Sequence, residues 1–91
     1  MSVHVRIPTI LRTYTEGASE VTAEGSTLAE VLDDLDGRYS GIKGRILDEA
    51  GELRRFVNVY VGNDDVRFLD GLQTPTPDGS SISVIPAVAG G

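Results

Sequence analysis

The spacing of apolar residues changes twice along the chain, and these changes restrict its fold more than any other feature. Apolar and polar residues alternate in 2–7, which is the pattern of a strand with one buried face. In 27–39 the apolar residues instead recur every three or four positions, as on one side of an α-helix. Alternation returns in 56–61 and again in 81–85. A single helical stripe between alternating segments favours a sheet covered on one face by one helix.

The helix predicted over 27–39 has clear signals at both ends. Thr27 and Glu30 have the spacing of a capping box, in which a hydroxyl and a carboxylate each accept a hydrogen bond from a backbone N–H. Gly37 is the expected stop, because glycine commonly ends helices. The side chains expected to face the core are Leu28, Val31, Leu32 and Leu35.

Two strands are predicted before the helix. Pro8 cannot donate a backbone hydrogen bond, so the first strand, 2–7, is expected to end there. Gly17 supplies a turn before a second strand at 19–23. His4, the only histidine, lies on the outward side of the first strand without a nucleophile or second metal ligand beside it, which indicates an ordinary surface residue.

Three more strands are predicted after the helix. The run 56–61 is followed by a turn at 62–65 and a short return strand at 66–68, which together form a hairpin. A turn at 77–79 leads into the last strand, 81–85. The predicted order is therefore β-β-α-β-β-β, an α+β fold in which a mixed sheet of about five strands carries one main helix on one face.

Composition limits the classes of function open to the chain. Its 91 residues suffice for one small domain, and 40% apolar with 24% charged residues is the balance of a folded protein. The net charge of −6 has the wrong sign for binding nucleic acid or an anionic membrane. No apolar run approaches the roughly 18 residues of a membrane span, so we expect a cytoplasmic protein. Without cysteine the chain has no disulfide, no thiolate nucleophile and no Cys-ligated zinc.

The final residues, PAVAGG, differ from the rest of the chain. Pro86 fixes φ and lacks an N–H, so we expect a domain at 1–85 and a flexible Gly-Gly tail at 86–91. One interpretation is a frayed terminus, which is common. The other is an arm that delivers the α-carboxylate of Gly91, since residues without Cβ can thread a narrow channel. A carboxylate needs activation before a nucleophile attacks it, and no GxxxxGK[ST] motif is present, so a partner would have to activate it.

Three segments resemble one protein family. FVNVYVGNDDVRF, PDGSSISVIPAVAGG and VHVRIPTILR are similar to the ubiquitin-like (β-grasp) sulfur-carrier proteins, the ThiS and MoaD group, and most closely to its CysO branch. The resemblance covers nearly the whole chain, from Val3 to Gly91. Two departures are small. Ser80 stands where a second acid often follows the Asp-Gly of the last turn, and PAVAGG replaces the PPxxGG typical of molybdopterin-synthase small subunits.

The resemblance implies a protein substrate of partner enzymes and not an enzyme. In this family an E1-like enzyme adenylates the terminal carboxylate with ATP, and sulfide or a sulfurtransferase converts it into a thiocarboxylate. Here the site would be Gly91, with no bound cofactor and no metal, and with ATP used by the partner. In the CysO branch the sulfur passes to a PLP-dependent cysteine synthase, and a metalloprotease releases the product. Cysteine synthesis and the synthesis of another thio-containing metabolite both stay open.

Partners are expected to contact the tail and one face of the sheet. Three strand residues, Phe56, Tyr60 and Ile85, alternate away from the predicted core and are candidates for a hydrophobic docking patch. The alternative is that loops cover this face. The tail residues expected to enter a partner are Ala87, Val88, Ala89 and Gly90.

Two other functions share parts of this pattern. A ubiquitin-like protein modifier would use the same activation step before Gly91 is joined to lysines of other proteins. Chain building on the protein itself would require Lys43, its single lysine. A small subunit of molybdopterin synthase would share the fold, so the residues alone do not separate these classes.

Overall fold

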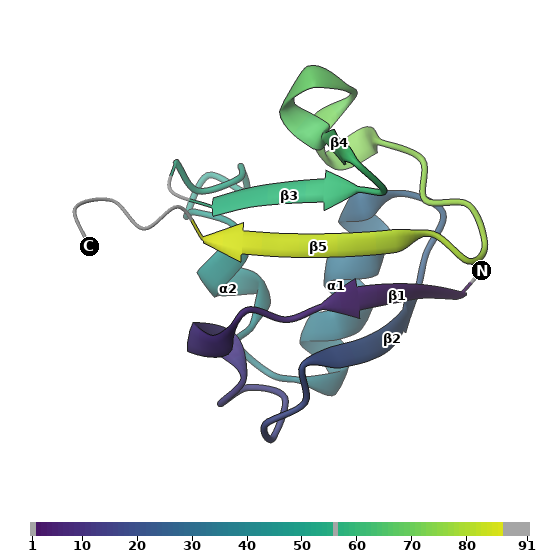
Figure 1. Cartoon of the computed structure of the whole chain (residues 1–91). Coiled ribbons are helices and arrows are strands. Elements are labelled where there is room, and N and C mark those ends of the chain that lie inside the picture. Colours follow the sequence, from purple (N-terminus) through teal and green to yellow (C-terminus); the bar gives the residue numbers. More distant parts are fainter. Residues whose placement is uncertain (1, 56, 87–91) are drawn as a thin grey trace.

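The computed structural model of the chain describes residues 2–55 and 57–86, which form a mixed sheet with one long helix across it (Figure 1). The sheet has the strand order β2-β1-β5-β3-β4, in which β1 and β5 are parallel and the other neighbours antiparallel. The predicted fold class and the order β-β-α-β-β-β are confirmed. The elements are β1 (Ser2–Arg6), η1 (Thr9–Leu11), β2 (Glu20–Glu24), α1 (Leu28–Arg38), α2 (Lys43–Ile46), β3 (Val57–Val61), β4 (Asp64–Asp65), η2 (Val66–Phe68), η3 (Gly71–Gln73) and β5 (Ser81–Pro86).

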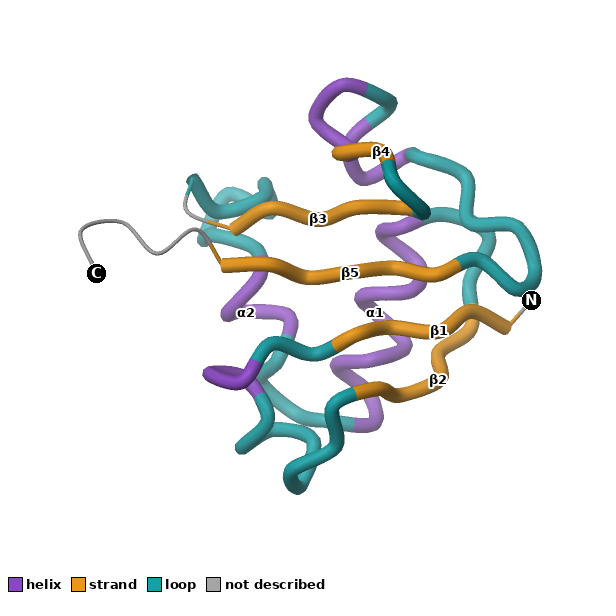
Figure 2. The backbone as a smooth tube through the Cα atoms, in the orientation of Figure 1, coloured by secondary structure: helices purple, strands orange, loops and turns teal. Residues whose placement is uncertain are grey.

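The core lies between the sheet and α1, which crosses behind β1, β5 and β3 (Figure 2). The helical stripe predicted from the sequence is fully buried at all four of its positions. The alternating strand residues meet it from the other side, with Val5, Val59 and Ile82 each fully buried. Burying these side chains stabilises the domain by roughly 1.5–3 kcal/mol each, which makes this layer the main source of stability. Among residues 2–55 and 57–86, no helix lies over the opposite face of the sheet (Figure 2).

The start of α1 matches the predicted capping box with a shift of one residue. The Thr27 hydroxyl accepts a hydrogen bond from the Glu30 N–H at 3.4 Å, while Glu30 Oε1 accepts from the Ser26 N–H at 2.9 Å. The predicted stop at Gly37 is wrong, because α1 continues to Arg38. A glycine costs a helix only about 1 kcal/mol, so the hydrogen bonds of the last turn outweigh it.

The predicted return strand at 66–68 is also wrong. The strand that returns along β3 in this hairpin is β4, at Asp64–Asp65, so the turn is only Gly62-Asn63. Residues 66–68 form the turn η2, because the Asp65 carboxylate accepts a hydrogen bond from the Arg67 N–H at 2.9 Å and caps it. This turn also lets Val66 enter the core, where it is fully buried.

The last strand is one residue longer than predicted. Pro86 ends β5 in register with Val57, the first residue of β3. Proline is tolerated at this position because a strand end needs no further donated hydrogen bond. The tail therefore begins at the end of the sheet where η1 and α2 also lie (Figure 1).

Candidate functional site

The predicted loading site and most of its neighbours lie outside the described residues. This applies to Phe56 and to the tail residues Ala87, Val88, Ala89, Gly90 and Gly91. The structure does describe the end of the sheet from which the tail starts, and the face next to it. In the part of the chain that is described, no group of three or more His, Cys, Asp or Glu side chains is arranged to hold a metal ion. No helix there is long and apolar enough to cross a membrane.

The face of the sheet opposite α1, which we call the outer face, carries the two described residues of the predicted docking patch. Ile85 is 48% exposed and Tyr60 is half-buried. In the β3–β5 register Ile85 lies opposite Asn58 and Tyr60 opposite Ser83, so Tyr60 and Ile85 are diagonal neighbours on the same face. Tyr60 and Ile85 therefore both lie on the face away from the core, as the alternation along their strands predicted.

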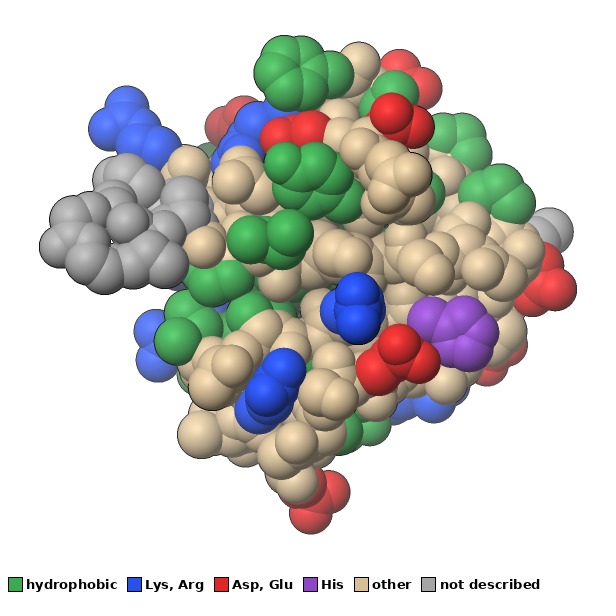
Figure 3. Space-filling view, viewed as in Figure 1, with side chains coloured by type: hydrophobic (Ala, Val, Ile, Leu, Met, Phe, Trp, Pro, Cys, Tyr) green, Lys and Arg blue, Asp and Glu red, His purple; other side chains and the backbone are tan. Residues whose placement is uncertain are grey.

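Three further large apolar side chains are exposed in the described part of the chain. Phe68 is 87% exposed, Ile10 is 67% exposed and Leu69 is 47% exposed. Apolar side chains gather over β3 and beside η2 at the top of the molecule, and again toward η1 (Figure 3). The sequence prediction missed Phe68, because it assigned 66–68 to a strand. It missed Ile10 because η1 interrupts the alternation after Pro8. The only sign of an exposed side chain there was that Ile10 belongs to no periodic pattern.

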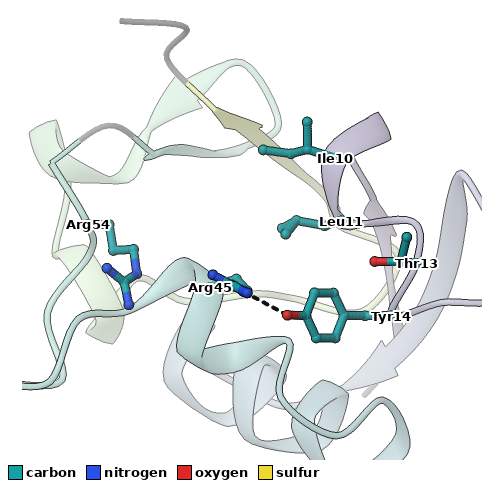
Figure 4. A pocket seen from close by; sticks show the side chains of 6 residues that line it. All are labelled: Ile10, Leu11, Thr13, Tyr14, Arg45 and Arg54. Carbon is teal, nitrogen blue, oxygen red and sulfur yellow. Dashed lines mark hydrogen bonds between the residues drawn. The ribbon is translucent and has the colours of Figure 1, made fainter.

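A pocket of about 350 Å³ lies at the end of the sheet where the tail begins (Figure 4). We call it the arginine pocket; its lining residues are Ile10, Leu11, Thr13, Tyr14, Arg45 and Arg54. Arg45 Nε donates a hydrogen bond to the Tyr14 hydroxyl at 2.6 Å. This hydrogen bond raises the pKa of Arg45 above its ordinary value, and an arginine guanidinium is in any case positively charged at neutral pH. Sequence reasoning missed the pocket, because its residues come from separate segments without a shared motif.

Several acidic side chains are used for local structure. On α1, Asp33 forms an ion pair with Lys43, and Asp34 pairs with Arg38 at 3.2 Å. Asp36 accepts hydrogen bonds from the backbone N–H groups of Gly41 and Lys43, at 3.1 and 3.3 Å. The negative charge on this side of the molecule is therefore partly compensated by neighbouring groups.

The architecture defines the class of protein. A mixed five-stranded sheet crossed by one main helix, with the C-terminal strand in the middle of the sheet, is the β-grasp or ubiquitin-like fold. The chain belongs to the ThiS family, whose sequence model matches residues 5–91. It is a sulfur carrier of this family.

Three similar proteins show where the chain stands within this family. Sulfur carrier protein CysO of Mycobacterium tuberculosis is 53% identical over 93 aligned positions that cover 100% of both chains. A chain of the crystal structure of the Amycolatopsis orientalis BexX/CysO complex has a TM-score of 0.92 and 50% identity, covering 98% of this chain and 99% of that one. Small archaeal modifier protein 3 of Haloferax volcanii is 40% identical over 68 residues, covering 75% of this chain and 73% of the relative. The chain is a CysO homologue that also has similarity to a modifier.

Proposed function

We propose that sulfur is loaded on the C-terminal carboxylate of Gly91 and that partner enzymes, not this chain, perform the chemistry. The observation that carries the proposal is the match to the ThiS family, which runs through residue 91 and so includes the Gly-Gly tail. It is supported by the topology, because β5 leads from the centre of the sheet directly into that tail. The folded domain is then a handle by which an enzyme holds the carrier.

Sulfur is loaded by adenylation of the Gly91 carboxylate followed by displacement of AMP. A carboxylate oxygen of Gly91 attacks the α-phosphate of ATP on an E1-like enzyme, which releases pyrophosphate and leaves an acyl adenylate. Sulfide then attacks the acyl carbon, and AMP leaves. If the sulfur comes instead from a sulfurtransferase persulfide, the attack releases AMP and forms an acyl disulfide, whose S–S bond a thiol reductant then cleaves. The product is a C-terminal thiocarboxylate. Because the chain has no cysteine, it has no thiol that would form a disulfide with the loaded sulfur.

Cysteine synthesis is the use that we propose for the sulfur. The full-length similarity to CysO supports this choice over other thio-containing metabolites. The acceptor is then a PLP-dependent cysteine synthase, followed by a metalloprotease that frees the product from Gly91. We place these steps in the cytoplasm, where ATP is available. The relative in the Amycolatopsis structure forms a complex with BexX, which supports the view that this chain also acts in assemblies with partners.

The outer face is the surface that we assign to the activating enzyme. Ile85 is the last residue of β5 before Pro86, so an enzyme that binds the tail also comes close to Ile85. Its side chain and that of Tyr60 supply apolar area beside the start of the tail. Phe68, exposed on η2, extends this area beyond β3. Exposed apolar area of this kind is typical of a protein interaction site.

A second candidate function is protein modification. It is favoured by the 40% identity to small archaeal modifier protein 3. A modifier would use the same adenylate, but the acyl group would pass to a lysine amine of another protein. Self-modification would require Lys43, whose ammonium group is engaged by the Asp33 carboxylate.

An intact-mass spectrum of the protein isolated from its own host separates these functions. The isolation is anaerobic and without reducing agents, because a thiocarboxylate is lost to oxidation and exchange. We expect a fraction heavier by the difference between sulfur and oxygen, located at Gly91, and a cysteine adduct on the same residue. Gly91-derived isopeptide remnants on other proteins, without any sulfur-bearing form, would instead establish a modifier.

Deletion of Gly90 and Gly91 tests whether Gly91 is the loading site. The domain should fold with unchanged thermal stability, because neither residue belongs to a described element. Adenylation should be lost completely. Adenylation that persists in the deleted chain would refute Gly91 as the loading site.

A further inference from the structure

We infer that the arginine pocket receives an acidic side chain, next to an apolar one, from the enzyme that activates the tail. The inference rests on the proposed function and adds a specific recognition site to it. The pocket combines two guanidinium groups with an apolar wall formed by Ile10 and Leu11. In the view of Figure 4, Arg45 lies between Tyr14 and Arg54, while Ile10 and Leu11 lie across from the two arginines.

Both guanidinium groups are held in place by one edge, which leaves the other edge for a ligand. Arg54 donates from Nε and Nη2 to the Gly44 carbonyl oxygen, at 3.1 and 2.8 Å. Arg45 donates from Nε to the Tyr14 hydroxyl, so both of its terminal nitrogens can donate elsewhere. An arginine that is already oriented loses less entropy when it binds a carboxylate.

The Tyr14 ring packs closely against the backbone at Gly41. Gly41 has a φ of +96°, and a Cβ at this position would lie 3.2 Å from the Tyr14 ring. Only glycine therefore fits well both the backbone conformation and the space beneath the ring. The Tyr14 ring is partly buried and packs against the hydrophobic core, which limits the movement of its hydroxyl and of the Arg45 side chain bonded to it.

The arginine pocket is positively charged in a chain whose net charge is −6. The ion pairs among residues 2–55 and 57–86 involve His4, Arg38 and Lys43, so neither arginine of the pocket is paired with a carboxylate in that part of the chain. Two adjacent positive charges in a chain of net negative charge favour one orientation of an acidic partner group over others.

The pocket lies where the activating enzyme must bind. Pro86 is in register with Val57, and the Val57 N–H donates a hydrogen bond to the Arg54 carbonyl oxygen at 3.0 Å. Residues 87–91 span at most about 17 Å when fully extended. An active centre that reaches Gly91 must therefore lie within that distance of Pro86, and the surface around it covers the neighbouring arginine pocket.

The apolar wall indicates a protein segment and not a small anion as the occupant. Ile10 is 67% exposed, and an inorganic anion held by the two arginines would leave it in water. A segment in which Asp or Glu adjoins a large apolar residue would satisfy the arginines and cover Ile10 at once. Removing this apolar wall from water favours binding of such a segment.

The test measures carrier-dependent ATP–pyrophosphate exchange by the adenylating enzyme of the same host. The full-length double variant Arg45→Gln/Arg54→Gln is compared with the unmodified chain over a range of carrier concentrations. We expect the KM for the carrier to rise about tenfold at low salt with kcat unchanged, because the pocket acts in binding and not in chemistry. The difference should shrink as salt is added.

Arg38→Gln on α1 is the control for each single substitution, Arg45→Gln and Arg54→Gln, because it removes one positive charge by the same change of side chain. Its KM should stay within about twofold of the unmodified value, and all variants should unfold at nearly the same temperature. An unchanged KM in the double variant, or an equal rise in Arg38→Gln, would overturn the inference while leaving the proposed function intact. If the unmodified chain supports no exchange, the proposed function fails and this inference fails with it.

Two other occupants are tested by NMR of the arginine Nε–H groups in the free full-length protein. If the chain's own tail occupied the pocket, deletion of Gly90 and Gly91 would shift the Arg45 and Arg54 signals. If a small anion were the ligand, inorganic phosphate at millimolar concentration would shift them in a saturable way. Either result would overturn the assignment to a partner segment, and unchanged signals in both experiments support it.

Discussion

Gly25 is expected to be the least replaceable of the described glycines, although its backbone conformation is ordinary. A Cβ built on Gly25 would lie 2.7 Å from the backbone N of Val31 and 2.8 Å from Cβ of Glu30. Both contacts are shorter than real Cβ atoms show, and the first turn of α1 cannot rotate away as a side chain would. In Gly25→Ala the connection between β2 and α1 must therefore move.

That movement disturbs a second set of contacts. The Gly25 carbonyl oxygen accepts a hydrogen bond from the hydroxyl of Thr76, a fully buried residue, at 3.0 Å. The Thr76 N–H donates to the Ser26 carbonyl oxygen at 2.9 Å, which joins the segment before β5 to the start of α1. Overpacking by a single methyl group costs about 1–2 kcal/mol, and a weakened buried hydrogen bond adds about 1 kcal/mol. We expect Gly25→Ala to lower the free energy of unfolding by roughly 2–3 kcal/mol.

Thermal and urea unfolding of Gly25→Ala measure this cost, with Gly37→Ala as the matched control. A loss of 2–3 kcal/mol corresponds to a decrease in Tm of roughly 10–20 °C for a domain of this size. Gly37 lies within α1 with open space around its Cβ position, so Gly37→Ala should stabilise the protein by about 0.5–1 kcal/mol. The same substitution of glycine by alanine is thus expected to lower the free energy of unfolding at position 25 and to raise it at position 37. A Gly25→Ala protein as stable as the unmodified chain would refute this account of the β2–α1 connection.

Three further substitutions test the helix cap, the outer face and the loading site. Thr27→Ala removes the hydroxyl that caps α1 and should cost about 1 kcal/mol, measured by urea unfolding; no loss would show that Glu30 alone suffices as a cap. Ile85→Glu should raise the KM of the carrier for its adenylating enzyme by at least about tenfold, whereas Thr22→Glu on the edge strand should not; equal effects would point to charge alone. Gly91→Ala should leave the Tm unchanged and impair adenylation; normal adenylation would contradict a channel that admits only glycine.

The sequence predicted those parts of the fold that follow from local periodicity. The stripe on α1 and the alternation in β1, β3 and β5 are set by which side chains must be buried, and the structure confirms them. The errors at Gly37 and at 66–68 have a different origin. Helix and strand ends depend on competition between hydrogen bonds, and in η2 a single Asp65 carboxylate decides the result.

The candidate site was predictable only in its outward-facing strand residues. Ile85 and Tyr60 follow from alternation along β5 and β3, whereas the arginine pocket depends on how distant segments meet. Tyr14 and Arg45 are 31 positions apart, and the Tyr14 ring also lies beside Gly41, where an added Cβ would be only 3.2 Å from the ring. No local pattern encodes such a contact, so tertiary structure is needed to find it.

The β3–β5 register connects the core to every surface used in the proposed function. Val59 and Val84 lie opposite each other facing α1, and the same register places Asn58 opposite Ile85 on the outer face. It also brings Pro86 to Val57, which is hydrogen-bonded to Arg54. A slip of one residue would turn Ile85 toward the core, because side chains alternate between faces. The packing of Val59 and Val84 therefore fixes the positions of the docking patch, the arginine pocket and the start of the tail relative to one another.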